Sequence, residues 1–293
     1  MRRGFWRRGV STTSTGCAAS GWPRTPRARG LSVLFRSQAG PPSVSDEAIL
    51  RQAREEAADE TRLSIWVDRG AASILAWSDP AAAAAQARKH GVRAIERNHR
   101  VWGTWALYDA VRWGHADVVI DKLAAAQAMR GADLVGAMRD HAEALAEQDP
   151  DRLEQAAMRM LNFGALLFAG EILTQLAGLL READPIGARR AAVKAQILVD
   201  RCPGAMTPCL RTLEPGLTSR EFEIAVDALD GRSSRQIAEA RFLSARTVDN
   251  HLHGIYRKLD IASRDELRGF LQPVAVSRPD NPDESGQTGR RSE

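Results

Sequence analysis

Cysteine is scarce in this chain. The three cysteines, Cys17, Cys202 and Cys209, form no CxxC motif, and no histidine cluster lies near them. This pattern excludes a disulfide framework and indicates no metal site, as is typical of a protein in the reducing cytoplasm. The sequence also lacks any run of about 18 apolar residues, so it predicts no membrane-spanning helix.

Two further patterns that would indicate an ATPase or a phosphorylation-dependent regulator are missing. The chain has no GxxxxGK[ST] string and therefore no phosphate-binding loop of the kind that nucleotide hydrolysis requires. It also lacks the alternating strands and helices with clustered aspartates of a phospho-receiver domain. No nucleophile, base and orienting group can be named together, so we expect a protein that is not an enzyme and uses no cofactor.

The net charge of +4 does not by itself indicate a nucleic-acid partner. Residues 1–45 contain eight arginines and no acidic residue, whereas the rest of the chain holds 33 basic and 37 acidic residues. Because residues 1–45 are also rich in Ser, Gly and Pro and poor in aliphatic residues, we expect a disordered tail there. The same composition resembles an organellar transit peptide, and a start codon assigned too far upstream also explains it.

The rest of the chain favours an all-α protein. Hydrophobic residues make up 44% of the chain and aromatic residues only 5%, and the apolar positions recur at helical spacing. Within residues 46–202 the helical pattern is broken near Gly114, Pro150 and Pro185, at intervals of about 35 residues. This period predicts a solenoid of stacked helical hairpins of the tetratricopeptide type.

The concave groove of such a solenoid offers a site for a peptide, a protein or a small-molecule inducer. Five tryptophans could line this groove, although aromatic residues at helical spacing more often form the core: Trp66, Trp77, Trp102, Trp105 and Trp113. Proline and glycine residues within 203–216 predict a linker, and residues 272–293 have the composition of a disordered tail.

Residues 217–271 carry the local signals of four short helices. Three of the helix starts have the sequence of a capping box. In this motif the hydroxyl of the first residue accepts a hydrogen bond from the backbone amide three residues later, and the acid or amide side chain of that later residue accepts from the first residue's backbone amide. The three boxes span 218–221, 233–236 and 263–266. Ser244 adds a simple N-cap, and Gly231 stands where the first helix must end. The helices at about 234–241 and 245–259 are joined by a very short turn, which predicts a helix-turn-helix.

The helix at about 245–259 has one apolar face. Val248, Leu252, Ile255 and Leu259 recur at helical spacing and must face the other helices. The residues that point away from this stripe or flank it are rich in hydrogen-bond donors: Arg246, Thr247, Asp249, Asn250, His253, Arg257 and Lys258. Arginine can read guanine, asparagine can read adenine, aspartate can accept from cytosine, and a basic helix end suits phosphates. We therefore expect contacts with double-stranded DNA.

This segment resembles the LuxR-type (GerE-like) DNA-binding domain of bacterial transcription regulators. The resemblance runs without gaps through the following stretches: 217–221, 237–238, 243–252, 255–259 and 263–267. It implies base contacts from Asp249, Asn250 and His253, and phosphate contacts near Arg235, Thr247 and Lys258. It also implies a homodimer formed through about 264–271, which would read two half-sites about one DNA turn apart.

Three residues depart from the family pattern. Asp249 stands where the family often has lysine, which lowers the positive charge toward DNA and leaves the preferred base open. Asp227 and Arg241 replace family leucines at positions that we expect to be partly buried. Because a lone buried charge is costly and the two charges are opposite, we predict that they pair.

The sequence thus predicts a cytoplasmic, nucleoid-associated transcription regulator whose helical-repeat region senses or relays a signal. That region resembles the last part of the large ATP-binding LuxR-type regulators, without their ATPase. Two alternatives remain open. Residues 217–271 hold nine basic and nine acidic residues, which also fits a protein-interaction module that no longer binds DNA. The other alternative is a remnant of an ATPase regulator that works only beside an intact ATPase.

Overall fold

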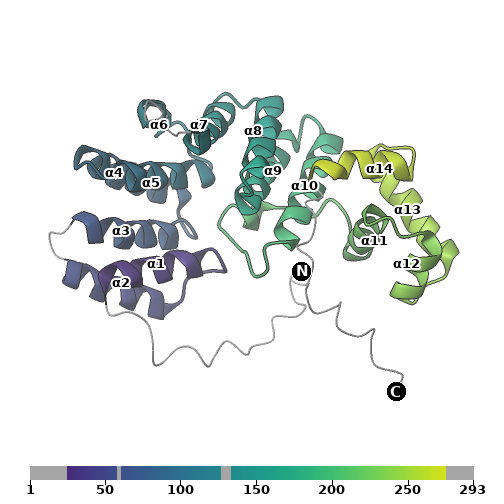
Figure 1. Cartoon of the computed structure of the whole chain (residues 1–293), viewed down its shortest axis with the longest axis horizontal. Helices are drawn as coiled ribbons and strands as arrows, with labels where there is room; N and C mark the ends of the chain where they lie inside the picture. Colours follow the sequence, from purple (N-terminus) through teal and green to yellow (C-terminus); the bar gives the residue numbers. More distant parts are fainter. Residues whose placement is uncertain (1–24, 58–60, 127–132, 275–293) are drawn as a thin grey trace, which may run out of the picture.

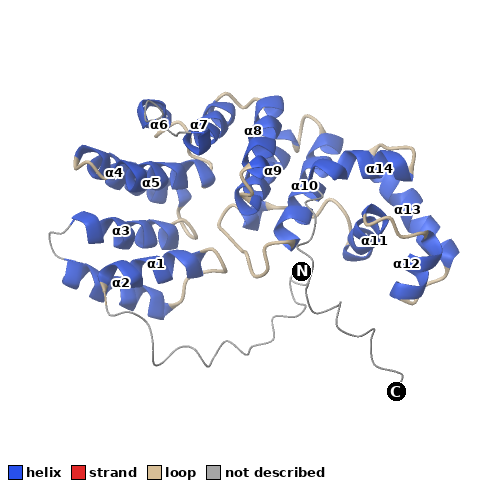
Figure 2. Cartoon of the chain, viewed as in Figure 1, coloured by secondary structure: helices blue, strands red, loops and turns tan. Residues whose placement is uncertain are grey.

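The structure, a computed structural model, describes residues 25–57, 61–126 and 133–274, and in these ranges the chain is all-helical (Figure 2). The described part contains no strand, only a single bridge between Ala39 and Met206. None of its helices combines the length and the apolar character that crossing a membrane requires. The predicted fold class, helical repeats followed by a four-helix helix-turn-helix, is confirmed.

The helices of the repeat region follow one another as a curved stack (Figure 1). Their bounds are α1 Pro26–Ser37, α2 Val44–Ala57, α3 Thr61–Leu75, α4 Pro80–Glu96, α5 Arg100–Arg112, α6 Ile120–Ala126, α7 Asp133–Ala146, α8 Pro150–Asn162, α9 Leu166–Leu180 and α10 Pro185–Asp200. Each helix packs against its neighbour in the chain, and α1 also packs against α3. Short connections between packed neighbours make these pairs helical hairpins.

The repeated helix boundaries follow from recurring local chemistry. Three helices begin with an aspartate N-cap whose side chain accepts a backbone amide, followed by proline: α4 at Asp79, α8 at Asp149 and α10 at Asp184. Four helices are followed by a residue with positive φ, and the backbone amide of the residue after it donates to a carbonyl five residues earlier. The residues with positive φ are Asn98, Gly114, Gln148 and Gly164. These stops satisfy carbonyls that a helix end would leave unpaired.

Helix α5 lies at the centre of the stack and carries a buried ionic network. Arg112 binds Glu171 of α9 through Nε at 2.7 Å and Nη2 at 2.9 Å, and it also lies 3.3 Å from Asp109. Asp109 in turn accepts from Arg69 of α3 at 2.8 Å. Burial alone would lower the pKa of Arg112, but the charge and hydrogen bond of Glu171 outweigh it and raise that pKa. The network therefore holds α3, α5 and α9 together as charged partners.

A second buried group links α5, α7 and α9. The hydroxyl of Tyr108 lies 3.1 Å from Nδ1 of His141, whose Nε2 lies 2.6 Å from Oε1 of Gln175. Burial, which outweighs the hydrogen bond to Oε1 of Gln175, lowers the pKa of His141 to about 4. His141 is fully buried and is therefore held neutral at pH 7.

We expect His141 to make the stability of the protein depend on pH between about 6.5 and 4. The unfolded chain binds a proton near the ordinary histidine pKa of about 6.5, whereas the folded chain does not until about pH 4. The free energy of unfolding should therefore fall as pH drops through this window, by at most about 1.4 kcal/mol per pH unit. Denaturant titrations of wild type and His141→Gln should diverge there, with His253→Gln as an exposed control. Parallel curves would contradict this assignment.

Four of the five tryptophans, all but the half-buried Trp77, belong to or pack against the hydrophobic core rather than lining an open groove. Trp66 and Trp113 are buried, and the rings of Trp66 and Trp102 lie 4.6 Å apart. Trp105 is half-buried, and its ring lies 5.7 Å from that of Phe168. This arrangement favours the core interpretation of the aromatic spacing.

The expected disordered tail is wrong for residues 25–45. Helix α1 occupies Pro26–Ser37 and buries Val33 against the stack. Gly30 lets α1 approach α3 so closely that a Cβ there would lie 2.5 Å from the carbonyl carbon of Trp66. The average composition of residues 1–45 misled the prediction, because it hid the local aliphatic residues Val33 and Leu34, which are buried. The acidic partner of Arg36 also lies just downstream, at Asp46, 2.5 Å away. Residues 1–24 lie outside the described part of the chain.

The expected linker at 203–216 is packed rather than free, which corrects a second prediction. The amide of Met206 donates to the carbonyl of Gln38 at 2.7 Å, and Cys209, Leu210 and Leu213 are buried. Its prolines and glycines mark turns, and turns do not require mobility. The expected C-terminal tail also begins later than predicted, because residues Gln272–Val274 form a short 3-10 helix with Val274 fully buried. Residues 275–293 lie outside the described ranges.

Candidate nucleic-acid interface

Four helices close the described chain with the boundaries that the capping signals predict. They are α11 Ser219–Leu229, α12 Ser234–Arg241, α13 Ala245–Leu259 and α14 Arg264–Leu271. The capping boxes of α11 and α12 are both complete, and Ser244 caps α13 through the amide of Thr247 at 3.0 Å. The third predicted capping box is only half formed. The hydroxyl of Ser263 accepts from the amide of Glu266, but the Glu266 side chain accepts from the amide of Ala262 instead of that of Ser263.

The turn between α12 and α13 is only three residues long. Phe242 takes the left-handed conformation, with φ of 56°, and the amide of Leu243 donates to the carbonyl of Ala238 at 2.9 Å. This bond ends α12, and the next residue, Ser244, is the N-cap of α13. Helices α12 and α13 consequently pack against each other as a helix-turn-helix, confirming the prediction (Figure 1).

The apolar stripe of α13 faces the core of this four-helix unit. Val248 and Ile255 are fully buried, and Leu252 and Leu259 are at most 4% exposed. The same cluster contains buried apolar residues of the three other helices: Ile224, Ile237 and Leu267. With this face fixed inward, the opposite face of α13 must point away from its neighbours.

That outer face carries the side chains predicted to read bases. Arg246, Asn250, His253 and Arg257 are all exposed. Within the described ranges, Arg246, Asn250 and Arg257 have no side-chain hydrogen bond or ion pair, whereas Nδ1 of His253 lies 2.8 Å from the carbonyl of Asp249. The donors of this face are therefore available to an external ligand.

Four other predicted contact residues are engaged within the protein. Lys258 binds both carboxylate oxygens of Glu221, at 2.6 and 2.7 Å. Asp249 accepts from the hydroxyl of Ser234 at 2.7 Å. Arg235 pairs with Glu239 at 3.2 Å, and both side chains are so exposed that the arginine can readily leave this pair for another partner. The hydroxyl of Thr247 lies 2.7 Å from the hydroxyl of Ser244.

The ion pair of Lys258 changes what that residue can contribute. Burial raises the pKa of Glu221, but hydrogen bonds from Lys258 and Thr218 outweigh it and leave that pKa below its ordinary value. The lysine is thus neutralised by a carboxylate that also caps α11. A phosphate contact from Lys258 would have to compete with this pair, so Arg257 is the more accessible cation at this helix end.

The predicted pair of Asp227 and Arg241 is present. Nε of Arg241 donates to Oδ2 of Asp227 at 2.6 Å, and this hydrogen bond raises the pKa of Arg241. The side chain of Asp227 is only 4% exposed, and Arg232 binds its other oxygen at 2.9 Å. Arg241 also lies 3.3 Å from Glu223. The buried carboxylate thus has two cationic partners.

We expect the substitutions Asp227→Leu and Arg241→Leu to be non-additive. Arg241→Leu leaves buried Asp227 with Arg232 alone, and Asp227→Leu leaves Arg241 with Glu223 alone. Each single change should therefore lower the free energy of unfolding by about 1–3 kcal/mol. The double variant should lose at least about 1 kcal/mol less than the sum, because the pair is removed together. Chemical denaturation of the four proteins measures this coupling. Additive losses, or single variants as stable as wild type, would argue against a functional pair.

The end of α13 is held by the repeat region, a feature that the sequence did not predict. Arg189 of α10 donates to the carbonyl of Lys258 at 2.8 Å, and Arg190 donates to the carbonyls of Leu259 and Asp260, both at 2.7 Å. A cation at a helix C-terminus also complements the negative end of the helix dipole. The helix-turn-helix is therefore docked on α10.

The comparisons with known proteins concern this same segment. Residues 215–270 match the family described as bacterial regulatory proteins of the luxR family, GerE. Over 54 residues the chain is 35% identical to a protein of Bacillus subtilis (strain 168) named "Uncharacterized transcriptional regulatory protein YhcZ". That similarity covers 18% of this chain and 25% of the relative, so the chain spans a quarter of that relative's length. No solved structure matches the chain significantly.

Residues 215–270 are therefore a LuxR-type helix-turn-helix domain, as the sequence resemblance predicted. Such a domain indicates DNA-binding transcription regulation. In the described part of the chain, no group of three or more His, Cys, Asp or Glu residues is placed to hold a metal ion. The individual contact residues remain predictions.

Proposed function

We propose that the protein is a sequence-specific DNA-binding transcription regulator that acts in the cytoplasm. The observation that carries this proposal is the outer face of α13, where Arg246, Asn250 and Arg257 are exposed and unpaired within the described residues. The apolar stripe of α13 at Val248, Leu252, Ile255 and Leu259 is buried in the core. The outer face takes no part in that packing, so packing does not explain its polar side chains. An α-helix with such a face fits the major groove of B-DNA.

The roles within this face follow from chemistry and position. Asn250 and Arg246 suit adenine and guanine edges, and Arg257 suits a phosphate beyond them. Asp249 accepts hydrogen bonds only, which favours a cytosine amino group once Ser234 rotates away. Phosphate contacts from Arg235 and Thr247 would flank the base-reading residues.

A homodimer through α14 belongs to the same proposal. The exposed residues Asp265, Arg268 and Gly269 lie on the outer side of α14. Phe270 on the other side lies under Lys194 and Arg190 of α10, at 4.6 and 5.7 Å from its ring. A second copy would therefore meet the polar outer side of α14, and two recognition helices would read a two-fold site.

The repeat region supplies the signal in this proposal. Because α10 binds the last carbonyls of α13 directly, a change in the stack reaches the recognition helix through Arg189 and Arg190. The effector is a peptide, a protein or a small molecule that binds the repeat region.

Selection of DNA from a random pool by the full chain tests the proposal. Wild type should enrich a palindromic site, and the double variant Asn250→Ala, Arg257→Ala should lose it. Glu182→Ala, an exposed position between α9 and α10, serves as the control for handling and folding. If wild type enriches nothing while remaining folded, DNA binding is not its function.

A protein-interaction module is the second candidate. The pairing of Lys258 with Glu221 and of Arg235 with Glu239 favours it, because both cations are partly neutralised without DNA. The two candidates differ in DNA affinity: the regulator should bind DNA with an affinity that falls steeply as salt rises, because phosphate contacts release condensed counterions, and the interaction module should not bind DNA.

A further inference from the structure

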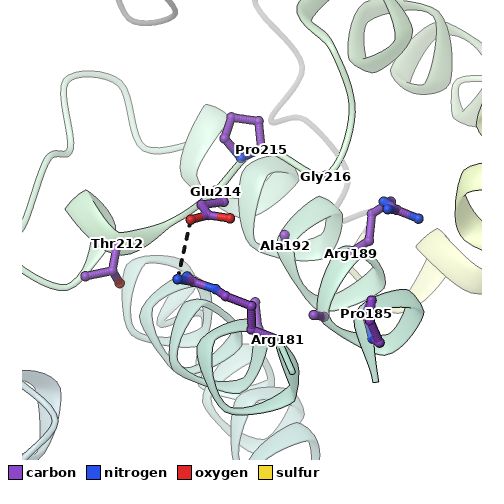
Figure 3. A pocket seen from close by; sticks show the side chains of 10 residues that line it. Arg181, Pro185, Arg189, Ala192, Thr212, Glu214, Pro215 and Gly216 are labelled. Carbon is purple, nitrogen blue, oxygen red and sulfur yellow. Dashed lines mark ion pairs between the residues drawn. The ribbon is translucent and has the colours of Figure 1, made fainter. Parts of the chain in front are cut away.

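A cleft of about 230 Å³ lies between α9, α10 and the chain segment 212–216 that leads into α11 (Figure 3). Small or rigid apolar residues form half of its lining, namely Ala177, Pro185, Ala188, Ala192 and Pro215, and the polar residues Arg181, Arg189, Thr212 and Glu214 supply most of its exposed surface. The volume is below the roughly 300–1,000 Å³ of sites for drug-sized ligands, so a compact molecule fits it best.

One side chain of the cleft is suited to bind an anion. The guanidinium of Arg181 points toward Glu214, as Figure 3 shows, and the two charged groups lie 3.4 Å apart. The side chains are 51% and 75% exposed, so this pair is weak and readily exchanged. Arg181 has five N–H donors in a planar fork that matches carboxylate or phosphate, and Glu214 satisfies few of them.

The cleft is directly connected to the recognition helix. Segment 212–216 forms one wall, and it packs so closely on α10 that a Cβ at Gly216 would lie 2.7 Å from the carbonyl oxygen of Arg189. Arg189 also lines the cleft, while its guanidinium reaches out to the carbonyl of Lys258 at 2.8 Å. Movement of this wall or of Arg189 therefore changes how α13 is held.

We propose that this cleft binds a compact organic anion, a carboxylate or phosphate on a small apolar body, and that the bound anion replaces Glu214 at Arg181. Displacement of Glu214 shifts the wall of the cleft at this residue, and Arg189, which lines the same cleft, passes the change to the docking of the helix-turn-helix on α10. The proposed binding site depends only on the geometry of the cleft, whereas the effect of the anion on DNA binding rests on the proposed function.

Ligand-observed NMR titration of the full chain tests the site, with benzoate and phenyl phosphate as probes and neutral benzamide as the matched control. Either anion should bind saturably at millimolar concentration, and benzamide should not. Arg181→Gln should weaken binding at least about tenfold. Glu214→Gln should strengthen binding about threefold or more, because it removes the internal competitor. The exposed Arg88→Gln of α4 should bind as wild type does.

Binding to benzoate alone or to phenyl phosphate alone identifies the anionic group. Absence of binding by both anions in wild type and in Glu214→Gln overturns the site, as does unchanged binding by Arg181→Gln. The coupling is tested by DNA affinity with and without the anion, and an anion that binds without changing this affinity overturns it. A chain that binds the anion but no DNA leaves the site standing and contradicts only the proposed function.

Discussion

Replacement of Arg112 by leucine should lower the free energy of unfolding by about 3–5 kcal/mol. The guanidinium is almost entirely buried, and Glu171, only 1% exposed, receives two hydrogen bonds from it. Without Arg112 this carboxylate would remain buried and unpaired, since Asp109 keeps Arg69 but Glu171 has no second cation among the described residues. Urea or guanidinium denaturation measures the loss.

The double variant Arg112→Leu, Glu171→Leu separates charge burial from packing. It should recover much of the loss, because an apolar pair needs no partner in the interior. The exposed Arg88→Leu should stay within about 0.5 kcal/mol of wild type. If the single and double variants were equally unstable, the effect would come from lost packing around Phe168, whose ring lies 4.7 Å from the Arg112 guanidinium carbon.

Substitution of Gly30 by alanine should destabilise the protein by about 3 kcal/mol or more. The added Cβ would lie 2.5 and 2.6 Å from backbone atoms of Trp66, which cannot move without separating α1 from α3. Gly178→Ala is a matched control, because Gly178 lies inside α9 with nothing within 4 Å of its Cβ position. That change should be neutral or stabilise by up to about 1 kcal/mol.

The comparison of the two glycines also tests whether α1 belongs to the folded repeat region. If residues 26–37 did not pack on α3, alanine at position 30 would favour a free helix as it does at position 178. Thermal unfolding midpoints of the two variants, measured beside wild type, decide between these outcomes. Equal midpoints would contradict the observed packing of α1.

The sequence predicted the helix-turn-helix in detail because its signals are local. Thr218, Ser233 and Ser244 cap the helices that follow them, and the spacing from Val248 to Leu259 determines which face of α13 is buried. Such signals depend on residues within one or two turns, so a single sequence contains them.

Features that depend on distant residues were missed. Helix α1 is stabilised by contacts with Trp66 and by ion pairs such as Arg36 with Asp46, and neither is visible in the composition of residues 1–45. The adjacent arginines Arg189 and Arg190 gave no local sign that they bind the end of α13. Lys258 was expected to contact a phosphate, and its pairing with Glu221 was not foreseen. Glu221 lies 37 residues away in the sequence and had already been assigned to the capping box of α11.

The salt dependence of DNA affinity tests the central claim most directly. For the full chain on its selected site, the logarithm of the association constant should fall linearly with the logarithm of salt concentration. Arg257→Ala should reduce the slope by about 0.9, one phosphate contact, whereas Asn250→Ala should keep the slope and lose the preference for the selected site. A folded chain whose DNA affinity is absent at low salt, or whose slope is the same in Arg257→Ala as in wild type, would contradict the account.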